Sequence, residues 1–143
     1  MVQNPAPGNL IVIVDDDINI RKALGIILRK EHFDVIEASC GQELHDILHR
    51  LRPRLIFLDV MMPGENGFDL CAELKTDTST AGIHIFLVTA RGMRQDVNKG
   101  FSMGADEYVL KPFFTKDVLA LVRKYLRTAP IDQCTQQKTI PAN

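Results

Sequence analysis

Five polar side chains follow apolar segments of the sequence and have the chemistry needed to handle a phosphoryl group. They are Asp15, Asp16, Asp59, Thr89 and Lys111. Three carboxylates in one place repel one another unless a cation lies among them, and their oxygens favour Mg²⁺, Mn²⁺ or Ca²⁺ over zinc. A lysine ammonium can bind a phosphate oxygen, and a threonine hydroxyl can donate a hydrogen bond to it. Such a set suits phosphoryl transfer, in which an aspartate carboxylate can be the nucleophile.

The elements that carry these residues alternate between two periodicities. Short, continuous apolar runs are typical of strands buried on both faces, and apolar residues at offsets of three and four indicate helices. The predicted strands are 10–14, 33–37, 54–59, 83–88 and 107–110. The predicted helices are 18–30, 41–51, 67–75, one between 94 and 103, and 115–126. Asp17 and Thr115 are candidate N-caps.

A strand followed by a helix, repeated five times, predicts an α/β fold with a doubly wound five-stranded parallel sheet. The common strand order 2-1-3-4-5 makes the first and third strands neighbours. Open sheets of this kind bind ligands beyond the carboxyl ends of their strands, where the strand order reverses. We therefore expect Asp15, Asp16 and Asp59 to share one pocket, with Thr89 and Lys111 beside it.

Composition and charge exclude several other kinds of protein. The 143 residues hold 17 Lys or Arg and 18 Asp or Glu, and 45% of them are hydrophobic, as in an ordinary folded domain. A net charge of −1 argues against a domain that coats nucleic acid, which usually carries a basic excess. Neither a secretory signal nor an apolar run long enough to cross a membrane is visible. We expect a cytoplasmic protein without a membrane partner.

The sequence predicts no functional role for the cysteines or for two of the histidines. Cys40, Cys71 and Cys134 are odd in number and far apart, which indicates reduced thiols rather than a disulfide framework or a zinc site. His45 and His49 have the i, i+4 spacing of a metal-binding helix. Because the sequence offers no third ligand nearby, we interpret them as part of a solvated helix face.

Four motifs carry a resemblance to a known family. They are Val-Asp-Asp-Asp at 14–17, Leu-Asp-Val-Met-Met-Pro-Gly at 58–64, Val-Thr-Ala at 88–90 and Tyr-Val-Leu-Lys-Pro-Phe at 108–113. In order and spacing they resemble the receiver domain of two-component response regulators, over about residues 9–127. The resemblance implies the flavodoxin-like (βα)5 receiver fold, and it implies that Asp59 is the phosphoacceptor.

The same resemblance implies a metal site. Asp16 would bind Mg²⁺ directly, and Asp15 would act mainly through a coordinated water. Asp59 and the backbone carbonyl of Met61 would complete the protein ligands. Mn²⁺ is the expected substitute for Mg²⁺, and no organic cofactor is expected.

Further roles follow for the residues around the phosphoacceptor. Thr89 would move to donate a hydrogen bond to the phosphoryl group, and Lys111 would pair with that group. Tyr108 matches the aromatic position whose rotamer reports activation, and the bond from Lys111 to Pro112 is expected to be cis. Met61 and Arg91 occupy two positions that tune dephosphorylation in this family. Neither side chain is an acid or amide that readily orients water, so we predict a phosphoryl lifetime longer than in the fast chemotaxis-type members.

The implied function is a switch controlled by phosphorylation. A histidine kinase or a histidine phosphotransfer protein would be the donor, and the surface of the fourth helix, fifth strand and fifth helix would control a partner. Phosphorylation-dependent homodimerisation through this surface is a family-level option. The domain would catalyse its own phosphorylation and slow dephosphorylation without being an enzyme in the metabolic sense. We expect no direct binding to nucleic acid.

The expected domain occupies residues 9–127, between a disordered segment at 1–8 and a flexible tail or linker stub at 128–143. Because no output domain fits after residue 126, the chain is either a stand-alone receiver or the start of a longer regulator.

Three other functions are disfavoured by particular residues. A flavin-binding protein shares this topology, but three acids at 15–17 would repel the FMN phosphate. A Mg²⁺-dependent phosphatase of the haloacid dehalogenase type needs a second acid two residues after the nucleophile, and that position is Met61. A degenerate receiver that acts only as a scaffold would not be expected to keep Asp16, Asp59, Thr89 and Lys111.

Overall fold

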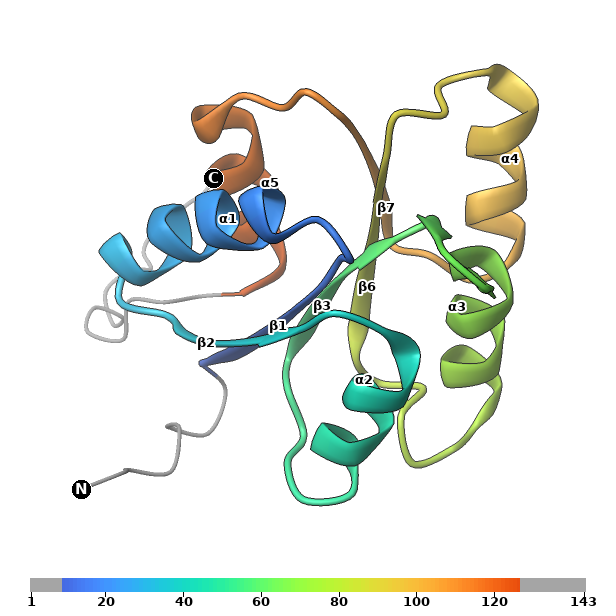
Figure 1. Cartoon of the computed structure of the whole chain (residues 1–143), viewed down its shortest axis with the longest axis horizontal. Coiled ribbons are helices and arrows are strands. Elements are labelled where there is room, and N and C mark those ends of the chain that lie inside the picture. Colours follow the sequence, from blue (N-terminus) through green and yellow to red (C-terminus); the bar gives the residue numbers. More distant parts are fainter. Residues whose placement is uncertain (1–8, 127–143) are drawn as a thin grey trace, which may run out of the picture.

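Five of the apolar segments form one parallel sheet in the computed structural model, which describes residues 9–126. The strands are β1 (Leu10–Val14), β2 (Asp34–Ala38), β3 (Leu55–Asp59), β6 (His84–Thr89) and β7 (Glu107–Leu110). Their order across the sheet is β2-β1-β3-β6-β7 (Figure 1), which confirms the predicted order 2-1-3-4-5. The expectations for residues 1–8 and 128–143 lie outside the described residues.

Helices cover both faces of this sheet, as predicted. They are α1 (Ile18–Lys30), α2 (Gly41–Leu48), α3 (Gly67–Thr76), α4 (Arg94–Ser102) and α5 (Thr115–Tyr125). Figure 1 shows α1 and α5 on one face, with α2 and α3 on the other. Among the described residues, no helix combines the length and the apolarity that a membrane crossing requires.

Side chains of β1 alternate between two buried clusters, one on each face of the sheet. Ile11 and Ile13 pack with residues of α1 and α5, while Val12 and Val14 pack with residues of α2 and α3. All five residues of β1 are at most 4% exposed. Burial on both faces explains why the sequence of β1 is continuously apolar instead of alternating.

The first residues of α1 and α5 can be compared with the N-caps predicted from the sequence. Asp17 caps α1 as predicted, because its carboxylate accepts a hydrogen bond of 2.8 Å from the N–H of Asn19. Thr115 is not the N-cap of α5, and that prediction is wrong. The cap is Phe114, whose carbonyl accepts from Asp117 and Val118 and whose side chain makes no capping hydrogen bond.

Helix α2 ends at Leu48 rather than at the predicted residue 51. The chain turns at 49–50 and has no regular secondary structure at 51–53, where Pro53 disfavours helical backbone in the residue that precedes it.

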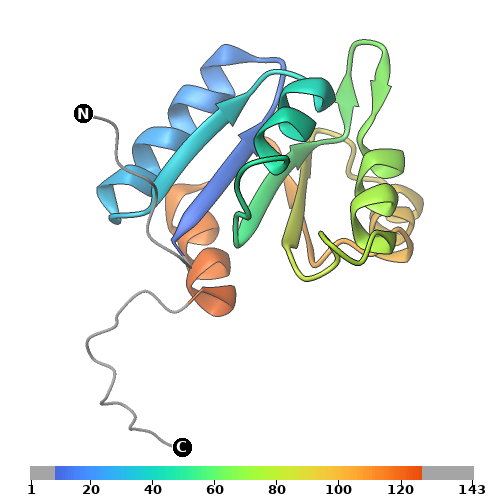
Figure 2. The ribbon, with the colours of Figure 1, turned by 90° about the horizontal axis from the view of Figure 1, so that it is seen from below.

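A small antiparallel hairpin, which we did not predict, follows β3 directly. It consists of β4 (Met61–Met62) and β5 (Glu65–Asn66), joined by Pro63 and Gly64. Gly64 has φ +73°, a conformation that glycine adopts at little cost and that suits a tight turn at this Pro-Gly pair. Figure 2 shows the hairpin projecting beyond the edge of the sheet. Strands of two residues carry no periodicity, which is why the pattern did not reveal them.

Candidate functional site

Three carboxylates meet at the carboxyl edge of the sheet, as the strand order predicted. Ligand oxygens of Asp15, Asp16 and Asp59 all lie within 4.8 Å of one another. Asp15 follows β1 and Asp59 ends β3, and these neighbouring parallel strands pair Val14 with Leu58. Asp15 and Asp59 are only 2% and 4% exposed, whereas Asp16 is exposed. Two acids of the cluster are therefore shielded from water, and the third faces it.

Local hydrogen bonds hold Asp15 in place. Its carboxylate accepts from the N–H of Asp17 at 2.9 Å, and its own N–H donates to the carbonyl of Ala38 at 3.1 Å. The guanidinium of Arg21 donates to the Asp15 carbonyl at 2.7 Å. The position of this acid is thus set by β2 and α1 as well as by β1.

Lys111 is the cation of the site. Its Nζ lies 2.9 Å from Asp15 Oδ2 and 3.6 Å from Asp59 Oδ1. Its backbone N–H donates to the carbonyl of Thr89 at 2.9 Å, which fixes the end of β7 beside the end of β6. The bond between Lys111 and Pro112 is cis, as expected. One ammonium cannot balance the negative charge of three carboxylates. The excess negative charge would favour a bound cation.

Burial and crowding change the protonation of Asp59. Burial first, and the neighbouring Asp15 charge second, raise the pKa of Asp59 from 3.8 to about 7, against the opposing effects of Lys111 and the Met61 N–H. Burial alone would lower the pKa of Lys111, but its hydrogen bonds and charge interactions with both acids outweigh that effect and raise it. With a pKa of about 7, Asp59 is therefore partly protonated near neutral pH when no cation is bound.

Met61 lies beside the acids in β4. Its N–H donates to Asp59 Oδ1 at 3.2 Å, and its side chain is 58% exposed. Together with Asp16 and Arg91, Met61 lines an open cavity of about 460 Å³ at this edge. The cavity gives a ligand access to the cluster, while the role of the Met61 carbonyl as a metal ligand stays a prediction.

Thr89, Arg91 and Tyr108 form a chain of hydrogen bonds next to the acids. Thr89 is 1% exposed, and its hydroxyl accepts from the N–H of Arg91 at 3.2 Å. The hydroxyl of Tyr108 donates to the carbonyl of Arg91 at 2.8 Å. The backbone of Arg91 therefore connects Thr89 and Tyr108, the two side chains to which the family resemblance gives a switching role.

Sequence reasoning missed two acids near the site. Asp96 of α4 is 7% exposed and forms a 2.8 Å ion pair with the Arg91 guanidinium. Glu65 of β5 accepts hydrogen bonds of 2.9 and 3.0 Å from the N–H of Gly41, the first residue of α2. Cys40, the N-cap residue of α2, makes no capping bond with its side chain. The hairpin after Asp59 thus supplies the cap of α2.

Comparisons with known proteins agree with the geometry. A family model described as the response regulator receiver domain matches residues 11–123. The DNA-binding response regulator MtrA of Mycolicibacterium paratuberculosis is 41% identical over 117 residues, which cover 82% of this chain and 51% of MtrA. The phosphate regulon transcriptional regulatory protein PhoB of Pseudomonas aeruginosa is 36% identical over 126 residues, covering 87% of this chain and 55% of PhoB. The chain spans about half the length of these relatives.

A solved structure gives the same result for the fold. The BeF3-activated N-terminal receiver domain of RstA from Klebsiella pneumoniae aligns with a TM-score of 0.76 and 31% identity. The alignment covers 83% of this chain and 99% of the RstA chain. Almost the whole of that domain therefore has a counterpart in this chain.

Proposed function

Since this chain belongs to the family of response regulator receiver domains, we propose that Asp59 accepts a phosphoryl group from a histidine kinase or a histidine phosphotransfer protein. The observation that carries the proposal is the placement of Asp59, a buried acid that clusters with Asp15 and Asp16 and lies 3.6 Å from the Lys111 ammonium. An Asp59 oxygen would form the bond to phosphorus while the bond from phosphorus to the donor's imidazole nitrogen breaks. The imidazole then leaves with a proton from solvent.

Lys111 and Met61 prepare Asp59 for this step. The Lys111 ammonium and the Met61 N–H both face Asp59 Oδ1, where they stabilise the negative charge of the carboxylate. The same ammonium can pair with an oxygen of the incoming phosphoryl group. After transfer, that negatively charged oxygen would take the place of the Asp59 carboxylate as a partner of Lys111. These contacts position the acceptor and neutralise negative charge. Positioning and charge neutralisation are the main contributions that a protein makes to the catalysis of phosphoryl transfer.

The acidic cluster fits a hard divalent cation, because its three carboxylates carry more charge than Lys111 balances. We assign Asp15, Asp16, Asp59 and the backbone carbonyl of Met61 as the residues that hold Mg²⁺, with Mn²⁺ as a substitute. When bound, the cation would relieve the repulsion among the carboxylates and polarise the phosphoryl oxygens. Asp59, with its pKa of about 7, would release its proton when the cation binds.

The hydrogen-bond chain through Arg91 supports a switch. If the Thr89 hydroxyl turns toward a phosphoryl oxygen, its bond to the Arg91 N–H is lost, and the Arg91 carbonyl that holds Tyr108 is no longer fixed. A rearrangement of Tyr108 would change the surface formed by α4, β7 and α5. That surface carries the exposed apolar side chains Phe101, Leu110 and Phe114, which a partner could cover.

The output of the switch follows from the relatives. The names of MtrA and PhoB describe a DNA-binding and a transcriptional regulator, and the match to this chain covers only about half of each. We therefore propose a DNA-binding output domain, in the same protein or in a separate partner, rather than contact between this domain and nucleic acid. Homodimerisation through the surface of α4, β7 and α5 is part of the proposal. So are a cytoplasmic location and a signalling role, with slow self-dephosphorylation, instead of a metabolic one.

Incubation with Mg²⁺ and acetyl phosphate tests the acceptor. Intact mass should increase by one phosphoryl group in the wild-type protein and not in Asp59→Asn. A second measurement, with beryllofluoride as a phosphate mimic, should change the oligomer size or the amide NMR signals of α4, β7 and α5 in the wild type only. If both proteins behave alike in the two measurements, the proposed function is wrong.

A further inference from the structure

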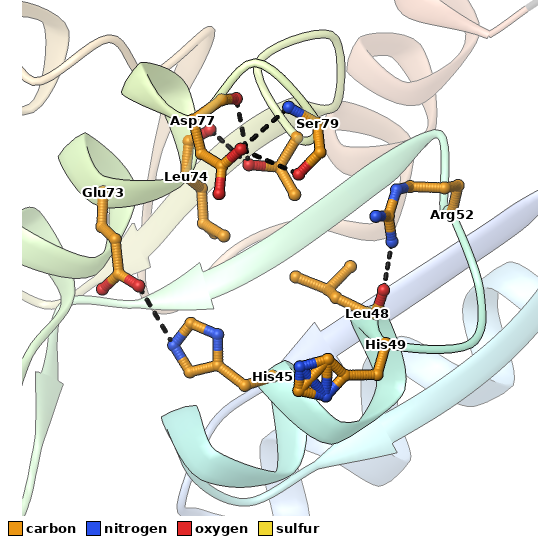
Figure 3. Close-up of a pocket in the computed structure, with 9 residues that line it drawn as sticks. His45, Leu48, His49, Arg52, Glu73, Leu74, Asp77 and Ser79 are labelled. Atoms are coloured by element: carbon orange, nitrogen blue, oxygen red, sulfur yellow. Dashed lines mark hydrogen bonds and ion pairs between the residues drawn. The ribbon is translucent and has the colours of Figure 1, made fainter.

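A second group of potential ligands lies far from Asp59, between α2 and α3. It lines a cavity of about 130 Å³ at the carboxyl ends of these two helices (Figure 3). In a parallel βα fold each helix runs back against the strands, so this cavity lies toward the edge of the sheet opposite to the acidic cluster. A ligand bound there would not compete with one at Asp59.

Two histidines and a glutamate face this region. The N–H of His49 donates to the carbonyl of His45 at 3.1 Å, so His49, the C-cap residue of α2, lies one helical turn after His45. Side chains at this spacing lie next to each other on one face of a helix. The sequence showed no third ligand, but the fold provides one, because His45 Nε2 lies 3.4 Å from Glu73 Oε2 of α3. Figure 3 shows His45 pointing toward Glu73 across the gap between the helices.

We propose that His45, His49 and Glu73 bind a divalent transition-metal ion, with Zn²⁺ as the best fit. Imidazole nitrogen and carboxylate oxygen are common zinc ligands, and three protein ligands with one water complete a tetrahedral site. Two ligands at about 2.0–2.1 Å from a tetrahedral ion are roughly 3.3 Å apart. The distance of 3.4 Å between His45 and Glu73 matches that separation.

His49 completes the site by a side-chain rotation. Among the described residues, only the cluster of Asp15, Asp16 and Asp59 already brings three ligand atoms within 4.8 Å of one another. His49 is exposed, so its ring can turn without displacing packed atoms. Because one ligand must be ordered on binding, the expected affinity is in the micromolar range rather than tighter.

The charged neighbours of the cavity are engaged elsewhere. Arg52 donates to the carbonyls of Leu48 and Leu51, and Figure 3 shows it on the side of the cavity away from Glu73. The carboxylate of Asp77 accepts from the N–H and the hydroxyl of Ser79 at 2.9 and 2.8 Å. Neither charge occupies the space between His45 and Glu73. A metal ion there would link α2 to α3 and stabilise the folded chain.

Ni²⁺ is a suitable probe, because it accepts the same ligands as Zn²⁺ and its paramagnetism broadens nearby amide NMR signals. The full chain, saturated with Mg²⁺, is titrated with Ni²⁺ and followed by NMR and calorimetry. We expect one micromolar site, with broadening centred on residues 45–49 and 73. His45→Gln and His49→Gln should each weaken it about tenfold or more, since each removes one of three ligands.

Two variants serve as controls. Asp46→Asn removes a charge from the same helix without removing a proposed ligand, and Asp59→Asn removes an acid of the other cluster. Both should bind Ni²⁺ as the wild type does. A dissociation constant weaker than about 1 mM, or a micromolar site that survives His45→Gln and His49→Gln, would overturn the proposal. Zn²⁺ should raise the melting temperature of the wild type and not that of His49→Gln.

Discussion

The hydroxyl of Tyr108 lies 2.8 Å from the carbonyl oxygen of Arg91. On the other side of the same residue, the Arg91 N–H is bound to the hydroxyl of Thr89 at 3.2 Å. Thr89 is buried at the edge of the sheet, whereas Tyr108 is half-buried and packs toward α4. A movement of Thr89 toward a ligand on Asp59 would therefore break a hydrogen bond of Arg91, the same residue whose carbonyl holds Tyr108.

Tyr108→Phe tests this connection. The variant keeps the ring and removes the hydrogen bond to Arg91, so it should lose about 0.5–1 kcal/mol of unfolding free energy. Phosphorylation of Asp59 by acetyl phosphate should proceed at a similar rate, because Tyr108 does not touch the acidic cluster. The response of α4 to beryllofluoride, measured by amide NMR, should be reduced. A full response of α4 in Tyr108→Phe would contradict the role of this hydrogen bond.

Gly100→Ala tests how tightly α4 packs on the Tyr108 ring. A Cβ at position 100 would lie 2.7 Å from Tyr108 Cδ2 and 3.0 Å from Leu87 Cδ1. Alanine normally stabilises a helix relative to glycine by about 1 kcal/mol. Here the overlap should reverse that sign and cost about 1–3 kcal/mol. Denaturant unfolding gives the value.

The same substitution in a Tyr108→Ala background provides the control for Gly100→Ala. Once the ring is removed, alanine at 100 should be less destabilising than it is in the wild type. Gly82→Ala, where no atom lies within 4 Å of the added Cβ, should leave stability almost unchanged. Equal effects of Gly100→Ala in the presence and absence of the Tyr108 ring would show that the two residues are not coupled.

Asp59 makes the stability of the metal-free protein depend on pH. Its pKa is about 7 in the folded protein against an ordinary value of 3.8, so the folded state keeps a proton that the unfolded state releases. The contribution of Asp59 to stability is therefore complete below about pH 4 and is lost as the pH rises to about 7. Denaturation from pH 5 to 8 should show this decline in the wild type and a weaker one in Asp59→Asn.

Binding of Mg²⁺ must follow the opposite trend, because the cation displaces the proton from Asp59. Its affinity should rise with pH up to about 7, and calorimetry below that pH should detect proton release on binding. An affinity that does not change between pH 5.5 and 8 would mean that Asp59 is already ionised in the metal-free protein.

The acidic cluster could be predicted from the sequence because each acid lies next to the end of an apolar run. Parallel strands align their ends, so the order of β1 and β3 alone brings Asp15 and Asp59 together. The position of Lys111 beside the acids could be predicted in the same way, because Lys111 and Pro112 directly follow the last short strand. These inferences need only periodicity and topology, which are both local or nearly local properties of the chain.

Glu65 and Asp96 could not be predicted in the same way. Glu65 caps a helix that begins 24 positions earlier in the chain, whereas the recognised capping patterns join residues only three positions apart. Asp96 looks like an ordinary acid in the first turn of a helix until the fold brings it to Arg91 and buries it. The prediction that Thr115 is the N-cap of α5 was wrong for a related reason. The sequence indicated a residue suited to capping, but the backbone enters the helix one position earlier, at Phe114.

Glu65→Ala should destabilise the start of α2. Glu65 provides both of its oxygens to the Gly41 N–H, and Cys40 offers no side-chain cap. Loss of a helix cap costs about 0.5–2 kcal/mol. Hydrogen exchange should be faster at Gly41 than in the wild type. Glu73→Ala is the matched control, because this exposed glutamate contacts His45 instead of the helix start. Unchanged exchange at Gly41 in Glu65→Ala would show that the hairpin does not hold α2.

From the family resemblance, we predict that the Met61 side chain influences how long the phosphoryl group remains on Asp59. Its side chain is 58% exposed beside the acids, and a thioether cannot hold an attacking water through a strong hydrogen bond. Met61→Asn places an amide there, and positioning of the water should shorten the phosphoryl lifetime about tenfold. Met93→Asn, at a methionine that is 65% exposed, is the matched control and should leave the lifetime unchanged. Decay of the phosphorylated mass over time measures it. A wild-type lifetime of seconds, or no change in Met61→Asn, would contradict this role for Met61.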